Sequence, residues 1–77
     1  MIKYINYGNP KYGTHMFIIT MFKTEYGNYK VEVLPCDHTG SPVSDPVFWD
    51  VFSSWFAAKH CMDQQYKEWF DFVNWRY

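Results

Sequence analysis

A β-hairpin is predicted at residues 15–34, which read HMFIITMFKTEYGNYKVEVL. Both halves are rich in β-branched and aromatic residues, and residues 25–28 (EYGN) supply the Gly and Asn that a tight reversal requires. Successive side chains of a strand point to opposite faces, so one face is expected to carry Phe17, Ile19, Met21, Val31 and Val33. The other face then carries Met16, Ile18, Thr20, Phe22, Lys30, Glu32 and Leu34. A slip of the pairing by one residue would exchange the two faces.

The segments on either side of the hairpin add further predicted strands. Residues 2–7 (IKYINY) are predicted to form a first strand, and the turn-forming residues 8–10 (GNP) and Gly13 close it. Residues 35–42 contain two prolines, a glycine and a serine, and we expect them to form a loop. A brief fourth strand is expected around Val43, and the prolines that flank it would confine it to an edge of the sheet.

The second half of the chain predicts two helices. Asp45 is expected to cap the first helix, with Pro46 at its first position, where the missing N–H donor costs nothing. Apolar residues recur at helical spacing and are expected to form one stripe, made up of Val47, Phe48, Val51, Phe52 and Trp55. This helix is expected to end near Lys59-His60, and a second one to restart at Cys61 or Asp63. The buried stripe of the second helix would be Met62, Tyr66, Trp69, Phe70 and Val73.

Strands followed by helices predict an α+β fold. The chain has 77 residues, which predicts one domain covering residues 1–77, because a core of this size does not divide. The expected architecture is an antiparallel three- to four-stranded sheet of order β-β-β-(β)-α-α, with two C-terminal helices packed on one face. Aromatic residues make up 23% of the chain and charged residues 19%, so this small body has more large rings than it can readily bury.

The surplus of rings predicts a contact surface. If the helices cover the face that contains Ile19, the face that contains Ile18 and Phe22 is left with apolar side chains and a few charges. Monomers seldom leave such a patch uncovered, and protein-binding sites combine aromatic anchors with a polar fringe. The alternatives are that the surplus rings contact one another, or that a second copy covers them as a homodimer.

Membranes and nucleic acids fit this composition poorly. The apolar stretch of residues 16–22 is too short to cross a bilayer, and residues 1–15 lack an apolar signal core, so we expect a soluble chain that is not exported. The net charge is −1 and cations are not clustered, whereas nucleic-acid binding by counterion release needs several clustered cations. The alternative is a site that binds single-stranded nucleic acid by stacking bases on tyrosines. Its residues would be Tyr4, Tyr7, Tyr12 and Tyr26, with Lys3, Lys11 and Lys23 interspersed among them.

Neither metal binding nor catalysis is expected. Two thiols and two imidazoles at Cys36, His38, His60 and Cys61 match the ligand types of a zinc site. Their spacing does not, because adjacent His60 and Cys61 on a helix would diverge by about 100°. No glycine-rich phosphate loop, nucleophile motif or framed carboxylate pair occurs in the sequence. We therefore expect a non-enzymatic protein without cofactor or metal.

Three short stretches resemble a known family of small phage proteins. They are Ile2-Lys3-Tyr4, residues 19–22 (ITMF) before the hairpin turn, and residues 54–56 (SWF). Together with the order of elements, they resemble the type I-F anti-CRISPR proteins that bind the repeated backbone subunit of the surveillance complex. The resemblance implies steric inhibition, in which the bound protein keeps target DNA from pairing with the guide RNA.

The resemblance also implies which residues bind the partner. Phe22 stands where the family has an exposed strand Tyr, and Tyr4 matches a second Tyr. A family Glu aligns with Val33, or with Glu32 after a shift of one residue. The face of the hairpin that contains Phe22 adds Ile18, Thr20 and Lys30, so the expected partner-binding residues are Tyr4, Ile18, Thr20, Phe22, Lys30 and Glu32. The expected partner is a type I CRISPR surveillance complex in the bacterial cytoplasm, and the alternative is a small module that binds single-stranded nucleic acid or another host protein.

Overall fold

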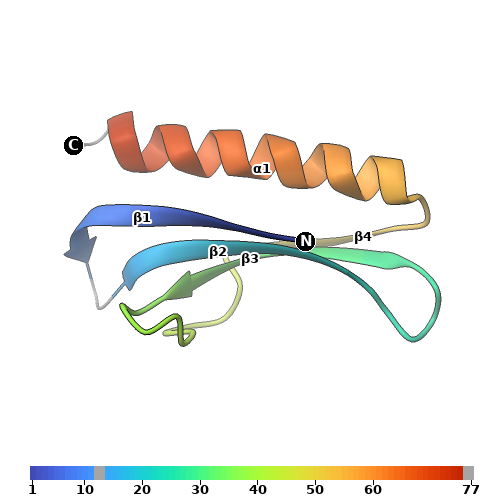
Figure 1. Ribbon diagram of the computed structural model, residues 1–77, viewed down its shortest axis with the longest axis horizontal. Coiled ribbons are helices and arrows are strands. Elements are labelled where there is room, and N and C mark those ends of the chain that lie inside the picture. Colours follow the sequence, from blue (N-terminus) through green and yellow to red (C-terminus); the bar gives the residue numbers. More distant parts are fainter. Residues whose placement is uncertain (12–13, 76–77) are drawn as a thin grey trace.

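Four antiparallel strands and one helix make up the described part of the chain. The computed structural model describes residues 1–11 and 14–75. The strands, β1 (Ile2–Lys11), β2 (Thr14–Lys23), β3 (Tyr29–Cys36) and β4 (Phe48–Phe52), pair in sequence order as a meander. The helix α1 (Trp55–Trp75) follows β4 and crosses one face of the sheet (Figure 1). The α+β fold with a helical layer on one face of an antiparallel sheet is therefore confirmed.

The hairpin forms with the expected register. Ile18 pairs with Leu34 and Ile19 with Val33, so the two predicted faces are the real ones. At the turn, Gly27 has a φ of 84°, a conformation that residues with a Cβ rarely adopt. The amide of Thr24 donates to the carbonyl of Asn28 at 2.8 Å, and the Thr24 hydroxyl also bonds the Asn28 side chain. The core on the face toward α1 includes Ile5, Phe17, Ile19, Met21, Val31 and Val33.

The predicted first helix is wrong in its first half, because residues 48–52 form β4. Their apolar residues fit a helical stripe, but Phe48 and Phe52 would also share one face of a strand, and β3 offers a free edge for pairing. Phe48 pairs with Val33 and Phe52 with Tyr29, and both phenylalanines pack against the core. Asp45 and Pro46, predicted to open a helix, instead lie in the loop that leads to this strand. The fourth strand predicted around Val43 is reduced to a single bridge between Cys36 and Pro42.

The two predicted helices are in fact one. Helix α1 runs unbroken through 21 residues, so neither Lys59-His60 nor Cys61 marks a helix end. No Gly or Pro interrupts this segment, so nothing in its sequence forces a break. Its N-terminus is capped by Ser54, whose hydroxyl accepts the amide of Ala57 at 3.4 Å.

Helix α1 packs on the sheet through a narrow apolar stripe. Ala58, Met62 and Val73 are buried against the sheet core. The ring of Trp69 packs on that of Phe17, with 4.8 Å between the ring centroids. Half-buried side chains at the border of this core are Tyr29, Phe48, Phe52, Cys61, Tyr66 and Trp69.

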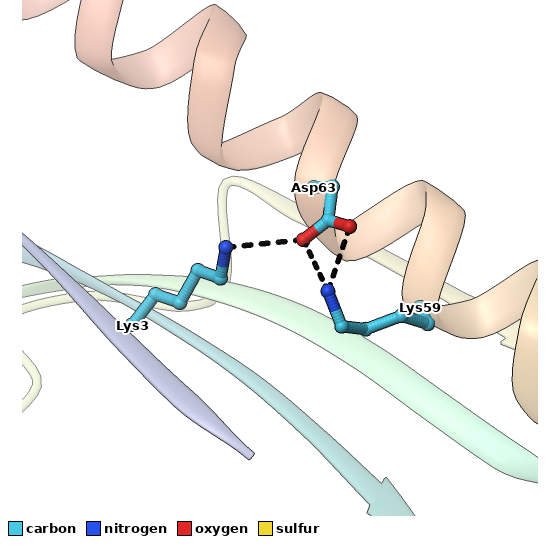
Figure 2. Close-up of polar contacts among 3 residues, drawn as sticks. All are labelled: Lys3, Lys59 and Asp63. Atoms are coloured by element: carbon cyan, nitrogen blue, oxygen red, sulfur yellow. Dashed lines mark hydrogen bonds and ion pairs between the residues drawn. The ribbon is translucent and has the colours of Figure 1, made fainter.

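An ion-pair cluster joins the helix to β1. The carboxylate of Asp63 accepts Lys59 Nζ at 2.7 Å and lies 3.0 Å from Lys3 Nζ (Figure 2). The same Lys3 ammonium lies 4.8 Å from the ring centroid of Tyr66. Asp63 therefore holds two lysines, one from its own helix and one from the strand beneath it.

Replacing Asp63 with Asn is expected to lower the free energy of unfolding by about 0.5–1 kcal/mol at neutral pH, the upper range for exposed ion pairs. Hydrogen bonds from Lys59 and Lys3 hold the pKa of the Asp63 carboxyl below its ordinary value of 3.8. Its stabilising effect is therefore complete above pH 3.8 and is lost as the pH falls through the lower folded-state value. Urea titrations of both proteins over this pH range should show the difference disappear in acid.

Asp71→Asn is the matched control, because Asp71 is an exposed carboxylate on the same helix. It should change stability less than Asp63→Asn at neutral pH. Equal effects of the two substitutions would show that the contact with Lys3 and Lys59 does not stabilise the fold.

Candidate functional site

The six predicted binding residues all lie on the sheet face opposite α1, here called the outer face. The strand registers align its side chains in rows across the sheet. One row runs Ile2, Thr20, Glu32, Trp49, and a second runs Tyr4, Ile18, Leu34. A third row runs Phe22, Lys30, Val51. The site is therefore an array of side chains on four strands, built by the alternation of the chain.

Large apolar side chains are exposed along both edges of the outer face. Tyr4 on β1 is 58% exposed and Trp49 on β4 is 59% exposed. Phe22 is 44% exposed at the end of β2, and Ile2 and Val51 are also exposed. An isolated exposed apolar residue is ordinary, but these five share one face of one sheet, which is a feature of interaction surfaces.

The sequence analysis does not place three of these residues, Ile2, Trp49 and Val51, on the outer face. Trp49 and Val51 were assigned to a helix, which removed them from the sheet. Ile2 is not predicted there because residues 2–7 (IKYINY) alternate too weakly to show which face of their strand is buried. Residues 48–52 (FWDVF) have one central charge between two pairs of apolar residues, so they alternate less clearly than residues 29–34.

Two opposite charges occupy the middle of the outer face. Lys30 Nζ lies 3.7 Å from a carboxylate oxygen of Glu32 and 5.2 Å from the ring centroid of Trp49. Both charged side chains are largely covered, with 32% and 17% of their surface exposed. The positive charge of Lys30 therefore offsets the negative charge of Glu32, and the Lys30 ammonium lies over one face of the Trp49 ring. This part of the outer face consequently carries no net charge.

The loop of residues 37–46 covers one end of the outer face. It lies on the side of the sheet opposite α1 (Figure 1). A Cβ placed on Gly40 would lie 3.9 Å from Ile18 Cδ1, and Cys36 at the start of the loop is fully buried. The loop is held by Asp37, whose carboxylate accepts the Thr39 hydroxyl at 2.6 Å and the Ser41 amide at 3.1 Å. These hydrogen bonds lower the pKa of the Asp37 carboxyl, and the bond from the Thr39 hydroxyl contributes most.

The two cysteines are free and lie in different layers. Cys36 ends β3 beneath the loop and does not belong to the core under α1, whereas Cys61 lies on α1 and packs against that core. Burial raises the pKa of both thiols, with further contributions from Asp37 to Cys36 and from Asp50 and Glu68 to Cys61. Raised thiol pKa values mean less thiolate, the reactive form. In the described residues, no three His, Cys, Asp or Glu side chains are grouped as a metal site.

Exposed rings also occur on α1, but in pairs along the helix. Phe56 is 79% exposed and contacts Trp55 edge to face, at 5.3 Å between centroids. Tyr66 and Phe70 stack at 5.8 Å one turn apart. The side chains of Tyr7, Lys11 and Tyr12, which the nucleic-acid alternative needs, lie outside the described residues.

Comparison with known proteins gives no relative. No protein-family model, characterised protein or solved structure matches the chain. Within the described residues, no helix is both long and apolar enough to span a lipid bilayer. The function must therefore be inferred from the surface itself.

Proposed function

We propose that the protein is a non-enzymatic binding module that docks on a host protein complex through its outer face. The observation that carries this proposal is the arrangement of five exposed apolar side chains around a neutral Lys30–Glu32 pair. Aromatic anchors with satisfied polar groups among them are the usual composition of the centre of a protein interface. Helix α1 packs on the other face, so a partner can reach the outer face without any rearrangement of the fold.

The proposed partner is the repeated backbone subunit of a type I CRISPR surveillance complex, and the proposed effect is steric exclusion of target DNA. The resemblance to type I-F anti-CRISPR proteins suggests this partner. Tyr4 and Phe22, at positions carried over from that family, share the outer face. Of the two candidates for the family Glu, Val33 is fully buried, whereas Glu32 lies on the outer face beside Thr20. The register therefore supports Glu32.

The charge distribution favours a protein partner over a nucleic acid. Lys30 is paired with Glu32 on the outer face, and Lys3 is paired with Asp63 on the opposite face. Lys3 and Tyr4 consequently point away from each other, although base stacking with phosphate binding would need them on one surface. A neutral aromatic surface supplies little counterion release.

The Phe22→Ala variant is expected to bind a purified type I-F surveillance complex about 10-fold more weakly than the wild-type chain, as is typical of an interface anchor. Its melting temperature should change little, because nearly half of the ring is already in water. Biolayer interferometry with the immobilised complex measures the affinity, and a target-DNA binding assay measures the block.

Phe56→Ala is the matched control, because Phe56 is an exposed ring on α1, outside the outer face. It should bind the complex like the wild type. Failure of the wild-type chain to bind would refute the proposed partner, and unchanged binding of Phe22→Ala would remove Phe22 from the docking surface.

A further inference from the structure

A groove lies on the helix side of the sheet, away from the outer face. It is a groove of about 480 Å³ between the start of β4 and the C-terminal half of α1. Its walls are Val47, Phe48, Gln65, Glu68, Trp69 and Phe72. The groove is therefore mostly apolar, with one carboxylate and one carboxamide among its walls.

Contacts within the chain already hold the aromatic wall of this groove in place. Trp69 Nε1 donates to Gln65 Oε1 at 3.1 Å, and its ring lies 4.8 Å from that of Phe17. Phe72 meets Trp69 edge to face at 5.5 Å, and 38% of its surface is exposed. An aromatic wall that is already held in place loses little side-chain entropy when a ligand binds.

The groove is also negatively charged. Glu68 forms part of its wall, and Asp50 also lies on the helix side of the sheet, since it pairs with the buried Val31. The helical step of about 100° per residue places Lys67 on the side of α1 away from the groove.

We propose that this groove binds a partner segment that carries an arginine beside a large apolar side chain. The apolar side chain packs on Phe48, Trp69 and Phe72, and the guanidinium lies against the Glu68 carboxylate and the face of a neighbouring ring. Charge complementarity selects this occupant, because arginine stacks on rings and pairs with carboxylates at the same time. The site is separate from the outer face and does not depend on the function proposed for it.

Two other occupants fit the groove less well. A second copy of this chain, related by a two-fold axis at this site, would bring another Asp50 and Glu68 to a surface that is already negative. An added strand would need free backbone groups on β4, but the Val51 amide already donates to its neighbour Asp50 at 2.7 Å. An edge strand whose amide is occupied in this way is a poor template for pairing.

The test is a titration of the full, isotope-labelled chain with the peptide acetyl-Leu-Arg-Leu-amide, followed by nitrogen–proton NMR. Saturable shifts are expected at the Trp69 indole N–H and at the amides of Val47 and Phe48. Glu68→Gln should weaken binding about threefold, in line with the loss of an exposed ion pair. Acetyl-Leu-Glu-Leu-amide should bind more weakly than the arginine peptide.

Glu25→Gln is the matched control, because it removes the same charge from an exposed residue in the β2–β3 turn. It should bind the arginine peptide like the wild type. The proposal is overturned if the peptide does not bind, if the shifts fall on Tyr4 and Trp49 instead, or if Glu68→Gln binds as well as the wild type. It is also overturned if sedimentation shows a dimer whose interface shifts map to the groove.

Discussion

Replacing Ile19 with Ala is expected to lower the free energy of unfolding by about 2–5 kcal/mol, the usual range for emptying a buried aliphatic site. Ile19 is fully buried on β2, between Lys3 of β1 and Val33 of β3. A chain of 77 residues has a total stability of only about 4–12 kcal/mol, so this one change removes a large part of it. Urea and thermal unfolding followed by circular dichroism measure the loss.

Ile18→Ala provides the matched control within the same strand. Ile18 is the same residue type one position earlier, but it is half-buried on the outer face, with the loop at Gly40 against it. Ile18→Ala should lower the free energy of unfolding clearly less than Ile19→Ala does, because it removes less buried apolar surface. A larger cost for Ile18 would mean that the pairing is slipped by one residue, which would exchange the outer face and the core.

The hairpin could be predicted because two independent signals agree within residues 15–34. Alternation assigns the faces, and the Gly27 turn fixes where the strands reverse. With both in place, the buried set including Ile19 and Val33 follows directly. The same alternation places all six predicted binding residues on the outer face, and their role in binding stays a prediction.

Residues 47–52 could not be assigned from local sequence. Phe48 and Phe52 are four apart, which suits a helix, and they are also on the same side of a strand. The open edge of β3 decides between helix and strand for this segment. That edge is a tertiary feature, which a local sequence pattern does not contain. The predicted break near Cys61 failed for a simpler reason, because no helix-breaking residue is present between Trp55 and Trp75.

The strand β4 (Phe48–Phe52) changes the expected centre of binding, because it brings Trp49 to the outer face. Trp49 is the most exposed large apolar side chain among the five, and Lys30 holds its ring from one side. Tryptophan is the residue type most enriched among interface residues that dominate affinity. Its row also contains Glu32 and Thr20, which supply the polar groups such an anchor needs around it.

Trp49→Ala is therefore expected to weaken binding to the purified type I-F surveillance complex by about 2–4 kcal/mol, which is the range for a dominant interface residue. The fold should be nearly as stable as the wild type, because the lost ring was mostly in water, and circular dichroism would verify this. Calorimetry or interferometry measures the affinity.

Trp55→Ala distinguishes loss of a tryptophan in general from loss of this one. Trp55 is 39% exposed, but it lies at the start of α1 and contacts Phe56 rather than the outer face. If Trp49→Ala binds like the wild type while Trp55→Ala does not, the partner docks on the helix instead of the sheet. If Trp49→Ala alone loses binding, the strand assignment of residues 48–52 and the outer face as the docking surface are supported together, because on a helix Trp49 could not share a face with Phe22 and Lys30.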